Sequence, residues 1–207
     1  MKRFNANLLW GVLLIAAGAL FLLQNMGYLQ NFSAAIWFVV FLVAGIGFLF
    51  VFTTNRAHWW ALIPAFVLIG LSGTIGLGTF APRLEGQWSG AVFLGSMGIG
   101  FIAVYFARRA NWWAIIPGGV MITLAVVTIA DAREIESGGI FFLGLAVTFA
   151  LIFLATGMRW PLIPAAVLFA IGLFIGTGLE KAINYVWPVA LIVAGLYMIY
   201  RVSRRAA

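Results

Sequence analysis

The stretch Ile36–Phe52 reads IWFVVFLVAGIGFLFVF and contains no charged, hydroxyl or amide side chain. Inside a bilayer every backbone amide and carbonyl needs an internal hydrogen-bond partner, so only helices and closed barrels can cross it. Strands of a membrane barrel alternate apolar and polar residues over about ten positions, whereas this stretch is apolar throughout. The same holds for Leu8–Leu23 near the N-terminus. Both stretches are therefore predicted to be transmembrane α-helices.

The composition of the whole chain indicates that a bilayer is its solvent. Of the 207 residues, 65% are hydrophobic and 8% are charged, whereas a soluble domain carries about 25% charged residues. The sequence predicts an all-α integral membrane protein with eight transmembrane helices in a single transmembrane domain, residues 1–207. The apolar segments between polar interruptions are residues 8–23, 35–52, 59–79, 89–106, 112–130, 138–156, 160–178 and 186–202.

A motif that recurs along the chain indicates internal repeats. Arg56–Pro64 reads RAHWWALIP, Arg109–Pro117 reads RANWWAIIP, and a shorter version, RWPLIP, occupies Arg159–Pro164. The prolines that end the three copies are 53 and 47 residues apart, which is the length of two membrane crossings with their turns. We predict four tandem helical hairpins, which enter the membrane in the same direction as parallel repeats. The hairpins are placed at about residues 1–55, 56–108, 109–158 and 159–207.

The charged residues separate into two groups of loops that alternate along the chain. The first group has nine basic residues and no acidic residue: Lys2, Arg3, Arg56, Arg108, Arg109, Arg159, Arg201, Arg204 and Arg205. The second has three basic residues and all five acidic residues: Arg83, Glu85, Asp131, Arg133, Glu134, Glu136, Glu180 and Lys181. By the positive-inside rule the first group is cytoplasmic, which places both termini in the cytoplasm. The net charge of +7 is attributed to the basic residues of the cytoplasmic loops, so no nucleic-acid partner is expected.

Tryptophans gather beside the basic loops, where indole rings prefer the boundary between headgroups and hydrocarbon. They are predicted to anchor the helices at this boundary. The alternative is a stacking surface for a flat cofactor or a lipid headgroup. The predicted anchors are Trp59, Trp60, Trp112, Trp113, Trp160 and Trp187.

His58 is the only histidine, and an imidazole near a membrane surface could ligate the metal of a haem or chlorin. The repeats place Asn111 and Met158 at the equivalent positions, so the histidine does not recur. Interfacial solvation of His58 is therefore the preferred interpretation, and cofactor binding is the alternative. No cofactor is predicted, whereas bound lipid is expected.

Small residues recur four positions apart within the apolar segments. This spacing lets two helix backbones approach closely in lipid, where packing drives association. The pairs could serve contacts within the chain or an interface with another chain. The predicted packing residues are Ser72 with Gly76, Ser96 with Gly100, and Gly172 with Gly176; Thr74 and Gly78 have the same spacing.

Chemically reactive side chains are scarce in this sequence. No Asp, Glu, Lys, Arg or His lies well inside an apolar segment, although such residues mark proton and ion pathways. The chain has no cysteine and none of the common nucleophile, phosphate-binding or metalloprotease motifs. The carboxylates of Asp131–Glu136 are expected to stay hydrated without a metal. The chain is predicted not to be an enzyme, and ion-coupled transport is disfavoured.

The first and last predicted hairpins resemble a known type of membrane region. Trp10–Ile15 is followed by Leu22–Leu29, which reads LLQNMGYL, and Val186–Leu196 reads VWPVALIVAGL. These stretches resemble the LiaI-LiaF-like transmembrane region of bacterial envelope proteins. The resemblance implies a bacterial cytoplasmic (inner) membrane and a habit of binding other membrane proteins. Members of that family act in envelope-stress signalling, and many carry a soluble β-rich domain, which does not follow the last apolar segment here.

Together these observations favour a non-enzymatic multi-pass membrane protein that works by helix–helix association. It would be a scaffold or accessory subunit of a larger membrane complex, or a partner of an envelope sensor. Its partners would be the lipid bilayer and other membrane proteins or further copies of itself. The alternatives are a carrier or channel for a neutral or apolar solute and a membrane subunit that binds haem or chlorin.

Overall fold

The computed structural model describes residues 33–178 without interruption, together with residues 15, 18, 19, 22, 23, 25–27, 188, 189, 191–195, 197 and 198. Across residues 33–178 every regular element is a helix. The predicted spans at 8–23 and 186–202 lie largely outside the described residues. The elements are α2 (Ser33–Thr54), the 3₁₀ turn η1 (Trp59–Ala61), α3 (Leu62–Phe80), α4 (Pro82–Ala107), the 3₁₀ turn η2 (Trp112–Ala114), α5 (Ile115–Asp131), α6 (Gly138–Thr156) and α7 (Leu162–Gly176).

Five of these helical segments are long and apolar enough to cross a membrane. They are Ala34–Thr54, Trp59–Phe80, Pro82–Ala107, Trp112–Asp131 and Gly138–Thr156, and the shorter apolar helix Leu162–Gly176 follows them. Six of the eight predicted spans therefore fall on described helices, and the prediction of helices is confirmed for this part of the chain, with five of them long and apolar enough to cross a membrane.

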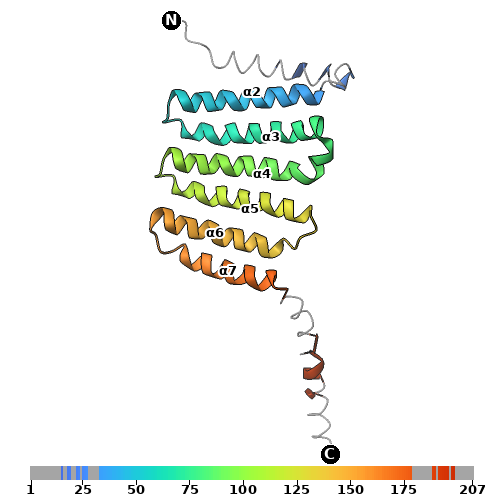
Figure 1. Cartoon of the computed structure of the whole chain (residues 1–207), viewed down its shortest axis with the longest axis vertical. Helices are drawn as coiled ribbons and strands as arrows, with labels where there is room; N and C mark the ends of the chain where they lie inside the picture. Colours follow the sequence, from blue (N-terminus) through green and yellow to red (C-terminus); the bar gives the residue numbers. More distant parts are fainter. Residues whose placement is uncertain are drawn as a thin grey trace, which may run out of the picture.

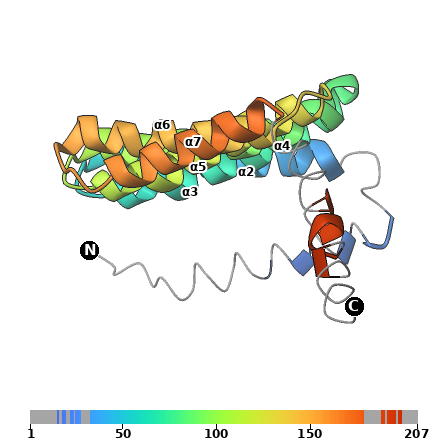
Figure 2. The same cartoon turned by 90° about the horizontal axis from the view of Figure 1, so that it is seen from below.

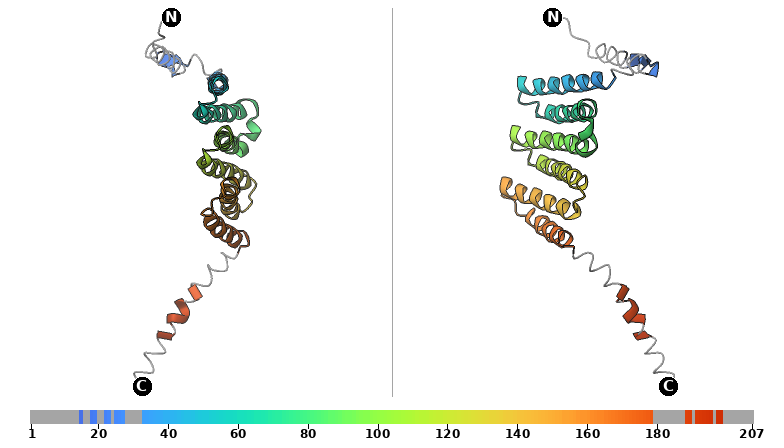
Figure 3. Two further views of the ribbon diagram at one scale, coloured as in Figure 1. Left: turned by 90° about the vertical axis from the view of Figure 1, so that its left-hand side faces the viewer. Right: turned by 45° about the vertical axis from the view of Figure 1, so that its right-hand side comes forward.

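The helices α2 to α7 form a single row in the order of the sequence (Figure 1). Each helix runs antiparallel to the one before it, and the substantial contacts between α-helices all join consecutive helices. The view along the row shows the helices largely superimposed (Figure 2). Seen from the side, the odd-numbered helices are inclined to the even-numbered ones (Figure 3). Each inner helix therefore packs against two neighbours and leaves the two broad faces of the row without a protein neighbour among the described residues.

The connections between helices lie along two opposite edges of the row. The connections after α2, α4 and α6 share one edge, on the left in Figure 1, and those after α3 and α5 share the other. The first edge carries Arg56, Arg108, Arg109 and Arg159, and none of its connecting residues is acidic. We call it the arginine edge. The opposite edge carries Arg83, Glu85, Asp131, Arg133, Glu134 and Glu136, so the members of the two loop groups that fall within residues 33–178 are separated in space.

Helix α4 begins earlier than the apolar pattern indicates. The predicted span starts at residue 89, whereas the helix starts at Pro82. Proline is favoured at the first helical position, and the acidic side chain of Glu85 lies in the first turn, where the helix dipole favours negative charge. The helix has 26 residues and extends for about 39 Å, which exceeds the roughly 30 Å of a hydrocarbon core. Its polar first turns can therefore lie among the headgroups.

The two full tryptophan motifs adopt the same backbone conformation. His58 has φ −84° and ψ 43°, and Asn111 has φ −85° and ψ 43°. Each precedes a 3₁₀ turn and accepts a 3.0 Å hydrogen bond on its carbonyl, from Ala61 and Ala114 respectively. Both alanines are fully buried. The prolines of the motifs stand at the third position of α3 and α5, where a missing amide costs little.

Candidate functional site: helix contacts and the arginine edge

The two serines predicted to pack helices donate hydrogen bonds to the preceding helix. The Ser72 hydroxyl on α3 donates to the carbonyl of Phe38 on α2, at 2.9 Å. The Ser96 hydroxyl on α4 donates to the carbonyl of Phe66 on α3, at 2.7 Å. Hydrogen bonds of this kind between helices in a membrane contribute about 0.6 kcal/mol on average.

Replacing Ser96 by alanine should lower the free energy of unfolding by about 0.6 kcal/mol, because the interhelical bond is lost. Ser89 on the same helix is a matched control, since its hydroxyl is buried without a hydrogen-bond partner in the described structure. Removing that hydroxyl should leave stability unchanged or raise it. Unfolding in mixed micelles, followed by circular dichroism, measures both. Equal losses for Ser96→Ala and Ser89→Ala would contradict the role of the Ser96 bond.

The predicted packing glycines lie where consecutive helices approach each other. A Cβ atom on Gly76 would lie 2.9 Å from the Phe38 ring of α2, and one on Gly100 would lie 2.7 Å from Cβ of Phe66 on α3. Neither approach leaves room for a methyl group. Of the remaining pair with this spacing, Thr74 donates its hydroxyl to the carbonyl of Leu71 within its own helix.

The contact between α6 and α7 brings backbone against backbone. A Cβ on Gly172 would lie 2.9 Å from the amide nitrogen of Leu143, and a Cβ on Gly139 would lie 2.7 Å from Cα of Gly176. The structure therefore places all six predicted packing residues at contacts within one chain.

Aromatic rings link the turns of the arginine edge to one another. Trp59 of η1 contacts Trp113 of η2 edge to face, with ring centroids 6.2 Å apart. Trp112 contacts Trp160, before α7, in the same way at 6.3 Å. In each motif the second tryptophan is more exposed than the first. One indole of each pair therefore packs into the row while the other faces outward, where an interfacial anchor would lie. The remaining predicted anchor, Trp187, lies outside the described residues.

Two arginines of this edge lie over aromatic rings of the preceding helix. The guanidinium carbon of Arg56 is 4.6 Å from the ring centroid of Phe52, and that of Arg109 is 4.6 Å from that of Tyr105. These distances are typical of cation–π contacts. The arginines remain exposed, so their charge is available to the headgroup region.

The candidate cofactor residue His58 is exposed, and its ring centroid is 6.3 Å from that of Trp60. Its counterpart Asn111 is buried, at 8% exposure, and its amide nitrogen has no hydrogen-bond partner in the described structure. Within the described residues no three of the His, Asp and Glu side chains gather as a metal site would require. The two copies of the motif thus share a backbone but differ in the exposure of this side chain.

Sequence reasoning missed a further set of small residues between α5 and α6. Gly119 of α5 faces Thr148 of α6, and Thr123 of α5 faces Gly144 of α6, so closely that a Cβ on either glycine would collide with the threonine. Gly119 and Thr123 are four residues apart, as are Gly144 and Thr148. The spacing that identified the other packing pairs therefore also identifies these two.

Comparisons with known proteins add no relative: no protein-family model, no curated protein and no solved structure matches this chain. Function is therefore inferred from the residues and their arrangement.

Proposed function

We propose that this chain is a non-enzymatic multi-pass membrane protein that works by helix–helix association. It acts as a scaffold or accessory subunit of a larger membrane complex, or as the membrane partner of an envelope sensor. The observation that carries the proposal is the single row of apolar helices. Because each inner helix of the described row packs mainly against its neighbours in sequence, residues 33–178 leave two long apolar faces for other membrane helices or lipid.

The exposed side chains on these faces are large and apolar. Ile99 and Phe106 of α4 lie one helical repeat of seven residues apart and are both more than half exposed. A stripe with this spacing is the kind of surface that a second helix can pack against. The connections between helices are short, so the described part offers little surface outside the membrane for other activities.

The proposal includes eight membrane crossings in four hairpins, with the arginine edge in the cytoplasm. Nine basic residues on one side and all five acidic residues on the other support this orientation. The resemblance to LiaI-LiaF-like regions supports a bacterial cytoplasmic membrane and partners in the envelope. Passage of a solute is the less favoured function, because a pathway needs helices that surround it and the row formed by residues 33–178 surrounds no space of its own.

Photo-crosslinking at single positions in native membranes tests association directly. A photoreactive residue at Ile99, which is 53% exposed, or at Phe106, which is 62% exposed, should yield a covalent adduct with another polypeptide. Val104 on α4 is fully buried and is the matched control, because its adducts should form only within the chain. Mass spectrometry of the adducts distinguishes a second copy from a different protein. Adducts with lipid alone from every exposed position on both faces would refute association.

A further inference from the structure

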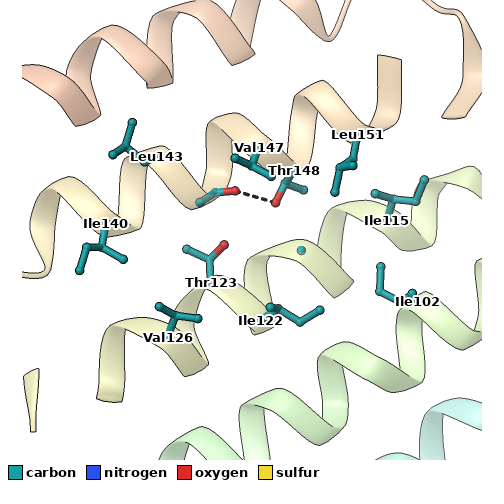
Figure 4. Close-up of a pocket in the computed structure, with 12 residues that line it drawn as sticks. Ile102, Ile115, Ile122, Thr123, Val126, Ile140, Leu143, Val147, Thr148 and Leu151 are labelled. Atoms are coloured by element: carbon teal, nitrogen blue, oxygen red, sulfur yellow. Dashed lines mark hydrogen bonds between the residues drawn. The ribbon is translucent and has the colours of Figure 1, made fainter. Parts of the chain in front are cut away.

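An elongated pocket lies between α5 and α6, beside α4 (Figure 4). Its volume is about 400 Å³, which is within the usual range for small-molecule sites. The lining extends from Ile115 to Val126 on α5 and from Ile140 to Leu151 on α6, which is about 16 Å along each helix at 1.5 Å per residue. Ile102 of α4 completes the wall. The pocket therefore runs along the helix axes, in the direction in which hydrocarbon chains lie in a bilayer.

One hydroxyl group in this pocket has no hydrogen-bond partner. The chain has nine threonines, and eight of them donate to a carbonyl of their own helix or turn. Thr123 is the exception within the described structure, although it is only 5% exposed. Figure 4 shows its hydroxyl directed into the space between α5 and α6, opposite the bond from Thr148 to Gly144. A hydroxyl that opens onto an apolar pocket without a partner is unfavourable, so a bound acceptor would stabilise this site.

The α3–α4 pair, one repeat earlier in the chain, has different side chains at the corresponding contact. Between α3 and α4, Phe66 packs directly against Gly100, and the Ser96 hydroxyl is satisfied by the carbonyl of Phe66. A large residue thus faces a small one, and the polar group between the helices is paired.

The α5–α6 pair has the opposite distribution of side chains. The 53-residue offset between the tryptophan motifs relates Phe66 to Gly119, so the phenyl ring is replaced by a hydrogen atom. Across from it stands Thr148, and the next contact places Thr123 against Gly144. Without the phenyl ring there is space beside the contact. At the contact where the α3–α4 pair has Ser96, the α5–α6 pair has Gly144, so Thr123 is the polar side chain that faces this space.

The depth of Thr123 limits what could occupy the pocket. It lies eight residues from either end of α5, or about 12 Å from each end, near the middle of the span. No charged side chain lines the pocket, so a phosphate or carboxylate would be buried without a counter-charge, at high cost. A neutral molecule that is mostly hydrocarbon, with an oxygen acceptor that can reach this depth, meets both requirements.

We infer that the α5–α6 pocket binds a neutral hydrocarbon-chain lipid that carries a carbonyl or hydroxyl oxygen, such as an isoprenoid quinone or alcohol, with Thr123 as its hydrogen-bond donor. The inference depends on the membrane setting but not on the association proposed above.

Native mass spectrometry of the full chain in mild detergent tests this site with three probes: decylubiquinone, farnesol and a phosphatidylglycerol. At least one of the two neutral probes should bind with a stoichiometry of one per chain. Tighter binding of decylubiquinone would indicate a quinone as the ligand, and tighter binding of farnesol would indicate an alcohol. Thr123→Val should weaken its binding about threefold, which corresponds to a typical membrane hydrogen bond, and Thr123→Ser should restore it. The double variant Gly119→Phe/Thr148→Gly recreates the Phe66–Gly100 contact and should reduce binding at least tenfold.

A second variant that fills the pocket keeps the test valid if the double variant Gly119→Phe/Thr148→Gly misfolds. Val126→Trp places a large ring in the pocket, and Val43→Trp places the same ring on the exposed face of α2. Circular dichroism and gel filtration establish that each variant is folded. Loss of binding in Val126→Trp with retention in Val43→Trp supports the site. Equal binding by both tryptophan variants, phosphatidylglycerol binding as tight as that of the neutral probes, or no binding of either neutral probe would overturn it.

Discussion

Replacing Gly139 by alanine should destabilise the protein, because the added methyl group forces α6 and α7 apart. The added carbon would lie 2.7 Å from Cα and 2.9 Å from the amide nitrogen of Gly176. Backbone atoms cannot rotate away as a side chain can, so the helices must separate along this line. Overpacking of this kind costs about 1–3 kcal/mol, and a larger residue such as leucine should cost more. Unfolding in mixed micelles, followed by circular dichroism, measures the loss.

Gly47 on α2 provides the matched control for this substitution. It is also a helical glycine, but a Cβ there would meet nothing within 4 Å. Alanine at this position should be neutral or stabilising by about 0.5–1 kcal/mol, because helix propensity improves without a collision. If Gly139→Ala and Gly47→Ala unfolded at the same denaturant concentration, the close approach of α6 and α7 would be wrong.

A single cysteine at Glu134 should react with a membrane-impermeant maleimide in intact cells, whereas one at Ala57 should react only after the membrane is opened. Both positions are exposed and lie in connections on opposite edges of the row. The natural chain has no cysteine, so the background labelling of this protein is zero. The expected difference is nearly complete, because a charged reagent does not cross the hydrocarbon core.

A cysteine at Ala110, between η2 and the end of α4, extends this experiment to the next repeat of the motif. It should behave like the one at Ala57, since the two positions are equivalent in the motif. The control for access is a denatured sample, in which all three must react. Labelling of Ala57→Cys from outside, with protection of Glu134→Cys, would reverse the orientation inferred from the arginines.

The spans themselves can be predicted from the sequence because hydrocarbon tolerates few kinds of backbone. The apolar pattern predicts a span at residues 138–156, and helix α6 has the same bounds. The predicted start of α4 is wrong because apolar content detects only the part of a helix inside hydrocarbon. Pro82 and Glu85 favour a helix by their positions in its first turn, although their surroundings are too polar for an apolar segment.

The arrangement of the helices cannot be predicted in the same way. Four-residue spacing identifies Ser72 and Ser96 as residues of helix contacts, but it does not say which helix they face, since a row and a closed bundle use the same small residues. The pocket is equally hidden, because it results from the exchange of Phe66 for Gly119 between two helix pairs. The motif repeat relates these two positions, but only the structure shows that both lie at a contact between helices.

Sequential packing of the row also has a consequence for how the protein enters the membrane. Each described helix after α2 packs against the helix synthesised immediately before it, so none of these segments has to await a distant stretch of chain still on the ribosome. Assembly can then proceed vectorially, one crossing at a time, and small residues such as Ser96 and Gly172 can engage the preceding helix soon after leaving the translocation machinery. An interruption late in synthesis would leave a shorter but already ordered array.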